Sequence, residues 1–254
     1  MFIDTHCHIF SDKFDEDVDD AIQRAIDNNV GKILMPNIDL GTVEAMNKLA
    51  QKYPKVCYPM MAIHPCDVKV DFEKELEFVD KELATGKYIA VGETGIDLYW
   101  SKDLIDQQKE SFKAHLQFGK KYNLPVVIHI RDSFDQVFEV IEQEVDESLF
   151  GIFHCFTGTL EQAKKAIDLG FDLGVGGVST FKKTHLNEVL DKIDLKNLVL
   201  ETDAPYLAPT PHRGKRNEPS YIPLIADKLA DFHQVSVDKI EEITTQNANR
   251  IFNL

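Results

Sequence analysis

The sequence lacks the features of exported, disulfide-bonded and membrane proteins. Its 254 residues contain four cysteines (Cys7, Cys57, Cys66 and Cys155) and no CxxC pair, which favours reduced thiols. No run approaches about 18 consecutive apolar residues, so we expect no membrane span and no membrane partner. No basic stretch precedes an apolar one at the N-terminus, so we expect no signal peptide. These absences predict a cytoplasmic protein.

Linkers and repeats are also lacking. The 13 glycines and 10 prolines are scattered, and no low-complexity segment or repeat of about 20–50 residues divides the chain. A hydrophobic content of 43% suffices for one large core. We therefore expect residues 1–254 to form a single domain. No long exposed apolar stripe is left over, so we expect a monomer.

Positive charge is scarce, because the formal net charge is −15. This argues against a broad, sequence-independent clamp on nucleic acid, which needs many Lys and Arg residues to neutralise phosphates. It still permits one phosphodiester to bind in a pocket that holds metal ions, because bound cations are often the largest local charges.

Apolar runs of strand length alternate with amphipathic helical patterns. The strands are predicted at 2–9, 32–37, 57–64, 88–93, 125–130, 150–155, 171–176 and 197–203. The helices are predicted at 15–29, 42–52, 72–86, 104–122, 134–146, 160–169, 185–193, 221–233 and 237–252, the last with Ser236 as its N-cap. This order predicts an α/β fold, a (β/α)8 TIM barrel. The alternative is an open doubly wound sheet, but the first strand lacks the Gly-rich turn typical of that fold.

Polar side chains close most of the predicted strands, where TIM barrels place catalytic residues. They are His6 and His8 after strand one, His64 after strand three, Glu93 after strand four, His129 after strand five, His154 after strand six and Asp203 after strand eight. We expect the other four histidines (His115, His185, His212 and His233) to be surface residues. Cys7 and Cys155 lie next to histidines on the strands, so they should point away from the site.

The spacing of these residues predicts a metal centre. His6 and His8 share one strand face and can bind one ion, while Glu93 could bridge to a second ion held by His129 and His154. Imidazole and carboxylate ligands suit zinc or manganese and tolerate magnesium. Each residue alone has a simpler explanation, a backbone hydrogen bond or a helix cap. Burying all of them at one rim is costly unless metal ions satisfy them.

The loop APTPHRGKRNEPSY after strand eight concentrates positive charge in an acidic chain. Arg213 and Arg216 are candidates for substrate contact or for the wall of the site, because guanidinium groups match phosphate. Arg131 follows His129 by two residues and can face the same mouth. His64 is a candidate contact to phosphate or leaving group. Tyr99 and Trp100 can stack on a base or simply plug a loop.

Seven motifs carry a family resemblance: DTHCH, AIHP, VGETGIDLYW, LPVVIHIRD, FHCFTG, LETDAPYLAP and RGKRNEP, in order from residue 4 to 219. With the tail TTQNANRIF (244–252), they make the chain resemble the TatD-type metal-dependent deoxyribonucleases of the amidohydrolase-like barrel superfamily. Leu98 and His212 depart from this pattern, where an aromatic residue and a tyrosine are common. The resemblance implies a TIM barrel, a divalent metal centre and hydrolysis of DNA, often as a 3′–5′ exonuclease on single strands.

The resemblance also implies roles for individual residues. One ion would be held by His6, His8, Glu93 and Asp203, and a second by Glu93, His129 and His154. Phosphate would be contacted by His64, Arg131, Arg213 and Arg216. We expect two divalent ions (Mg, Mn or Zn) to activate a hydroxide that attacks phosphorus. Asp203 would orient or deprotonate the water, and Glu201, on the same strand face, would support the ligands.

Two other functions compete with this hypothesis. The same metal centre could serve a small-molecule amidohydrolase or esterase, because fold and metal do not determine the substrate. The basic loop after strand eight argues against a neutral amide. A zinc-stabilised scaffold without turnover is the third possibility. It fits less well, since structural zinc sites are usually closed cages of four ligands.

Overall fold

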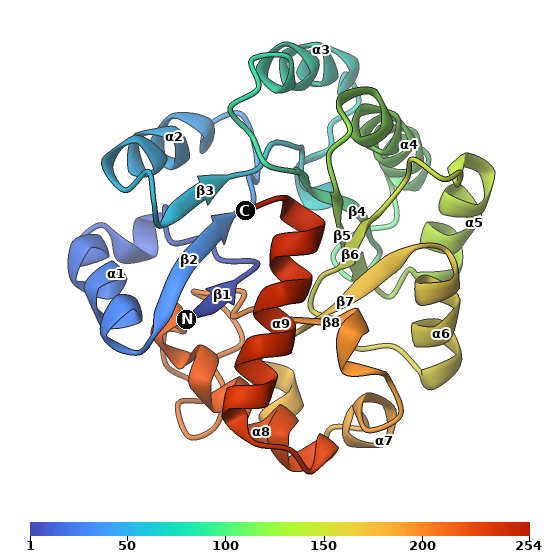
Figure 1. Cartoon of the computed structure of the whole chain (residues 1–254). Helices are drawn as coiled ribbons and strands as arrows, with labels where there is room; N and C mark the ends of the chain where they lie inside the picture. The colour runs from blue at the N-terminus through green and yellow to red at the C-terminus, as the bar shows by residue number, and fades with distance from the viewer.

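Eight short parallel strands, joined through helices, form the centre of the computed structural model, which describes residues 1–254 (Figure 1). Hydrogen-bonded ladders join the strands in sequence order, as one group of three and one group of five. The strands are β1 (Phe2–Asp4), β2 (Val30–Met35), β3 (Cys57–Pro59), β4 (Val91–Asp97), β5 (Val126–Arg131), β6 (Gly151–Phe153), β7 (Phe171–Val175) and β8 (Leu198–Leu200).

Backbone hydrogen bonds just outside the regular strands close the ring. Between β3 and β4, the N–H of Met61 donates to the carbonyl of Ala90 at 3.1 Å. Between β8 and β1, the N–H of Thr5 donates to the carbonyl of Leu200 at 3.0 Å. The eight strands therefore form a closed parallel barrel, and the predicted (β/α)8 TIM-barrel fold is confirmed.

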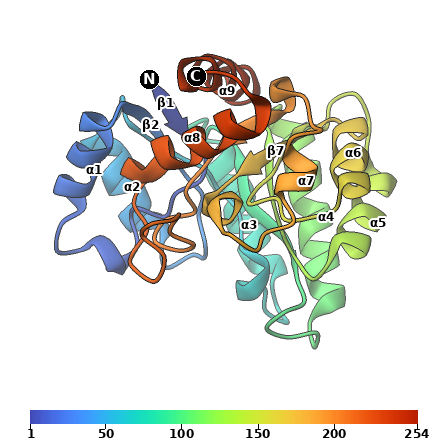
Figure 2. The ribbon, with the colours of Figure 1, turned by 90° about the horizontal axis from the view of Figure 1, so that it is seen from below.

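Helices surround the strands and also close one end of the barrel. They are α1 (Val18–Asp27), α2 (Val43–Lys52), α3 (Glu73–Leu83), α4 (Ile105–Tyr122), α5 (Phe134–Glu144), α6 (Leu160–Asp168), α7 (Asn187–Leu190), α8 (Ile222–His233) and α9 (Val237–Phe252). In Figure 2, α9 lies across one end of the barrel, beside the N-terminus. None of the helices combines the length and the apolar character needed to cross a membrane.

The interior of the barrel is a packed apolar core. Alternate residues of the strands point inward, among them Leu34 of β2, Val127 of β5 and Val199 of β8. Ile251 and Phe252 of α9 pack against this inner cluster. A larger cluster lies between the strands and the surrounding helices. Because α9 seals the N-terminal end, polar side chains have room only at the carboxyl ends of the strands.

Several predicted elements are shorter in the structure. The predicted strand 2–9 pairs regularly only over Phe2–Asp4, and Cys7 then makes a single bridge to Ala204. The predicted helix 185–193 is reduced to Asn187–Leu190. The chain leaves the regular ladder where it turns over the rim of the barrel. The N-cap prediction for the last helix is confirmed, because the Ser236 hydroxyl accepts from the N–H of Lys239 at 3.2 Å.

The expectation that His115 lies on the surface is wrong, because this side chain is fully buried in α4. Its Nδ1 donates to the carbonyl of Ser111 at 2.7 Å, and its Nε2 accepts from the N–H of Ile63 at 3.2 Å. The imidazole thus anchors the chain segment that ends at His64. Burial lowers the pKa of His115 to about 4, because the charged form would lose its hydration.

We expect the contribution of the buried His115 to the free energy of unfolding to depend on pH, and the variant His115→Gln to reveal this dependence. The folded pKa of about 4 lies below the unfolded value of about 6.5. At a pH between these two values, the unfolded state therefore binds one more proton than the folded state. The contribution of His115 to stability is therefore complete above pH 6.5 and is lost as the pH falls toward 4. Urea unfolding of the metal-free proteins should show the parent's advantage over the variant shrinking by about 2 kcal/mol from about pH 7 to about pH 5. An equal advantage at both pH values would contradict this account.

Candidate metal centre

The seven polar residues predicted at strand ends converge at the open end of the barrel. Glu93 lies within β4 and His129 within β5, while the other five follow the ends of β1, β3, β6 and β8. Glu93 is at the centre of the cluster, and its side chain is only 3% exposed. The structure thus brings together residues that lie up to 197 positions apart in the chain (6 to 203).

One oxygen of Glu93 faces the two histidines that follow β1. Oε2 lies 3.1 Å from Nε2 of His6 and 3.5 Å from Nε2 of His8. The two imidazole nitrogens are 3.2 Å apart. Oδ1 of Asp203 lies 3.6 Å from Nε2 of His8 and 3.8 Å from Nε2 of His6. These four side chains therefore present their donor atoms to one point.

The other oxygen of Glu93 faces a second set of imidazoles. Oε1 lies 2.6 Å from Nδ1 of His129 and 2.7 Å from Nε2 of His154, and these two nitrogens are 3.4 Å apart. Nε2 of His64 lies 3.6 Å from the same oxygen. A single carboxylate thus joins two groups of nitrogen donors, one at each of its oxygens.

The donor atoms fit divalent cations better than they fit one another. In each of three groups centred on these residues, the candidate ligand atoms lie within 4.8 Å of one another. A neutral imidazole nitrogen has either one hydrogen or one lone pair, so Nε2 of His6 cannot satisfy all the polar atoms around it. A divalent cation accepts nitrogen and carboxylate donors at the same time.

Carboxylates behind two imidazoles set their tautomers. Nε2 of His129 is 3.1 Å from Oδ2 of Asp97, and Nδ1 of His154 is 3.3 Å from Oε1 of Glu201. A hydrogen donated to these carboxylates leaves the opposite ring nitrogen free to bind a cation. Sequence reasoning selected Glu201 but missed Asp97. Asp97 lies four residues after Glu93 in β4, and the two-residue alternation of a strand could have indicated it.

The electrostatics of the cluster keep its central carboxylate, Glu93, ionised. Burial alone opposes ionisation of Glu93, but the charge on His154 holds its pKa well below the ordinary value. Burial likewise opposes the charged form of His154, yet Glu93 and Glu201 raise its pKa well above the usual range. Burial raises the pKa of Asp203 to about 6. Glu93 is therefore held ionised at the centre of the cluster.

The structure gives His64 a different tautomer from the ligand candidates. Its Nδ1 accepts from the N–H of Cys66 at 3.1 Å, so in the neutral ring the hydrogen is on Nε2. That N–H points toward the metal cluster, and the side chain is 16% exposed. His64 is thus arranged to donate a hydrogen bond at the mouth.

The three arginines predicted to contact phosphate have different surroundings. Arg131 is exposed and stacks on the ring of Tyr99 at 3.7 Å. Arg213 is exposed and stacks on the ring of Phe181 at 4.1 Å. Both guanidinium groups keep their N–H donors free of carboxylates. Arg131 also lies 5.5 Å from the ring of Trp100.

Arg216 is instead held by carboxylates. Its guanidinium donates to both oxygens of Asp17 at 2.6 and 2.7 Å, and to Glu218 at 2.9 Å. It also stacks on the ring of Phe14 at 4.3 Å. These contacts join the loop after β8 to the segment before α1. The structure therefore does not place Arg216 with the free arginines at the mouth.

A TIM barrel with imidazoles and carboxylates gathered at its open end defines the class of metal-dependent hydrolases. Residues 3–253 match the family model described as TatD related DNase. The chain belongs to this family, and it is a metal-dependent hydrolase. The family predicted from the sequence motifs is confirmed.

Known relatives cover nearly the whole chain. It is 36% identical over 255 residues to a protein of Bacillus subtilis (strain 168) named "Uncharacterized metal-dependent hydrolase YabD", with both chains fully covered. It is 29% identical over 257 residues to the "3'-5' ssDNA/RNA exonuclease TatD" of Shigella flexneri serotype 5b, covering 99% and 98% of the two chains. The crystal structure of YJJV, a TatD homologue from Escherichia coli K12, superposes with a TM-score of 0.94 at 30% identity, covering 100% and 98% of the two chains.

We expect Asp97→Asn to weaken metal binding without unfolding the protein. An amide N–H facing Nε2 of His129 would move the ring hydrogen to Nδ1, the nitrogen that must bind the cation. Loss of such a support typically lowers metal affinity 10–100-fold. Competition of Zn²⁺ or Mn²⁺ with a chelating indicator would measure the change. The exposed neighbour Asp103→Asn is the matched control, and an unchanged affinity in Asp97→Asn would contradict the assignment.

Proposed function

We propose that this hydrolase cleaves phosphodiester bonds of single-stranded DNA, as a 3′–5′ exonuclease, with two divalent ions (Mg, Mn or Zn). The observation that carries the proposal is the position of Glu93, whose two oxygens face separate pairs of imidazoles at 2.6–3.5 Å. Paired cations are typical of enzymes that displace an oxygen at phosphorus. The name of the Shigella flexneri relative supports the same substrate.

The ligand sets follow from the geometry around Glu93. His6, His8, Asp203 and Oε2 of Glu93 would hold one ion, and His129, His154 and Oε1 of Glu93 the other. Such ions, when bound, supply the Lewis acidity that activates water and neutralises phosphoryl oxygens. The chain itself holds the ligands in position, through Asp97 behind His129 and Glu201 behind His154.

Asp203 is best placed to take a proton from the attacking water. Its side chain is 14% exposed, whereas those of Glu93 and Glu201 are 3% and 0% exposed. A general base must reach both the reacting water and the solvent that finally receives the proton. Glu93 is enclosed by imidazoles and Glu201 lies behind His154. Among these three carboxylates, Asp203 has the most open path to solvent.

Hydrogen-bond donors at the mouth suit a phosphate group. His64 presents its Nε2–H toward the cluster, and Arg131 and Arg213 have exposed guanidinium groups without carboxylate partners. The two guanidinium groups are charged, and charged donors make short, strong hydrogen bonds to phosphate oxygens. A neutral amide or ester would not need them. A monomeric state, a single domain and a cytoplasmic location stay predictions from the sequence.

Metal exchange and the variant Glu93→Ala test this function together. The protein is stripped with chelator, reloaded separately with Mg²⁺, Mn²⁺ or Zn²⁺, and given single strands labelled at the 5′ or the 3′ end, beside amide and ester substrates. We expect the 5′-labelled strand to shorten stepwise. We expect Glu93→Ala to lower kcat/KM by at least about 10³-fold, because both ligand sets lose a carboxylate.

The exposed Glu147→Ala is the matched control and should keep the parent's activity. Cleavage of DNA by Glu93→Ala at the parent's rate would show that the nuclease assignment is wrong. Hydrolysis of amides or esters, with no cleavage of any strand by the reloaded parent, would favour the small-molecule alternative.

A further inference from the structure

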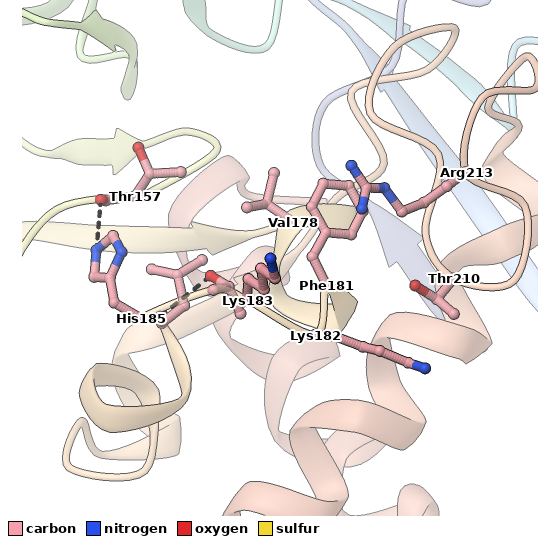
Figure 3. A pocket seen from close by; sticks show the side chains of 10 residues that line it. Thr157, Val178, Phe181, Lys182, Lys183, His185, Thr210 and Arg213 are labelled. Carbon is pink, nitrogen blue, oxygen red and sulfur yellow. Dashed lines mark hydrogen bonds between the residues drawn. The ribbon is translucent and has the colours of Figure 1, made fainter.

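Two adjoining cavities lie on the loops at the open end of the barrel. The first has a volume of about 730 Å³ and is formed by the loops after β6, β7 and β8 (Figure 3). The second, of about 740 Å³, lies over the loops after β5 and β6 and includes Arg131 and Tyr99. Both include Thr157 and His185, so they form one continuous depression.

The first cavity begins close to the metal centre. Thr157 lies three residues after His154, a ligand candidate. Three residues of extended chain span at most about 11 Å. The wall of the cavity at Thr157 therefore lies within this distance of His154, measured between Cα atoms.

The walls of this cavity are tied together by hydrogen bonds. Nε2 of His185 donates to the carbonyl of Thr157 at 3.0 Å, which joins the loops after β7 and β6 (Figure 3). The N–H of Thr210 donates to the hydroxyl of Thr180 at 2.9 Å, which joins the loops after β8 and β7. A Cβ added at Gly177 would lie 2.1 Å from the carbonyl oxygen of Leu207, so the two loops also pack closely.

Positive charge lines this cavity and no carboxylate does. Lys182, Lys183 and Arg213 are all exposed, and none has a carboxylate oxygen within 4.0 Å. Most exposed cations on the helices of this acidic protein pair with Asp or Glu, as Lys52 does with Asp19. The guanidinium of Arg213 also stacks on the ring of Phe181, and this contact holds the guanidinium at the wall of the cavity (Figure 3). The second cavity differs, because Asp132 and Asp135 line it beside Arg131.

We propose that this cavity, which we call the basic groove (Phe181, Lys182, Lys183 and Arg213), binds backbone phosphates of a single-stranded nucleic acid next to the phosphodiester held at the metal centre. The inference rests on the proposed nuclease function and extends its substrate site beyond one phosphate. Unpaired cations around an aromatic ring are the usual means of holding a flexible single strand without reading its sequence. The backbone of DNA and that of RNA share this chemistry.

The test uses the triple variant Lys182→Ala/Lys183→Ala/Arg213→Ala. Binding of the metal-loaded enzyme to a fluorescent strand of about 12 nucleotides with cleavage-resistant phosphorothioate linkages is followed by anisotropy over a range of salt concentrations. We expect at least about tenfold weaker binding, and a slope of log affinity against log salt that is smaller by about 2, since each phosphate contact on a single strand contributes about 0.7. Cleavage of unmodified strands should show a KM that rises more for long strands than for dinucleotides.

The matched control is Lys55→Ala/Lys81→Ala/Lys87→Ala, which removes the same charge from exposed residues that precede β3 and β4, at the opposite end of the barrel. It should bind and cleave as the parent does. Parallel DNA and RNA strands of one sequence show which backbone binds more tightly. If the parent cleaves single strands and the groove variant keeps the parent's affinity and salt slope, the basic groove is wrong and the nuclease function stands. If the parent neither binds nor cleaves any strand, both proposals fall.

Discussion

The carboxylate of Glu93 links two sets of imidazoles, and the rest of the site depends on this link. Each oxygen faces its own group, with His6 and His8 on one side and His129 and His154 on the other. The barrel makes this possible because β4 lies across the mouth from β1 and next to β5. A packed interior and the helix α9 close the other end, so the polar cluster can form only where the loops leave the strands. Burying so many ionisable groups costs free energy, and bound cations would offset that cost.

The hydrogen-bond partners of the imidazoles determine which of them can bind a cation. Asp97 and Glu201 each direct a hydrogen away from the nitrogen that faces the centre. The N–H of Cys66 does the opposite for His64, since it leaves that ring with a hydrogen at the mouth. One residue type therefore serves as ligand in one place and as donor in another. The hydrogen bond on the far side of the ring decides between the two roles.

The distribution of charge matters more here than its total. The chain carries a formal charge of −15, yet the loops after β7 and β8 present cations without carboxylate partners. Arg213 and Arg216 lie three residues apart, and only the second is neutralised, by Asp17 and Glu218. Arg216 fastens its loop to the barrel, and that anchored loop presents Arg213 to solvent. The acidic surface of the rest of the protein would repel nucleic acid, so that binding is confined to the rim of the barrel.

The sequence by itself determined the order of strands and helices and the residues at the strand ends. Both are local, since a two-residue or 3.6-residue period and a polar residue after an apolar run are visible without long-range contacts. The same alternation could have indicated Asp97 from Glu93. Only the tertiary structure decided that His115 is buried against Ile63, that Arg216 pairs with Asp17 and that Lys182 and Lys183 share a groove with Arg213. The reason is physical: Asp17 and Arg216 are 199 positions apart, and nothing in either local pattern specifies which distant group the fold will bring alongside.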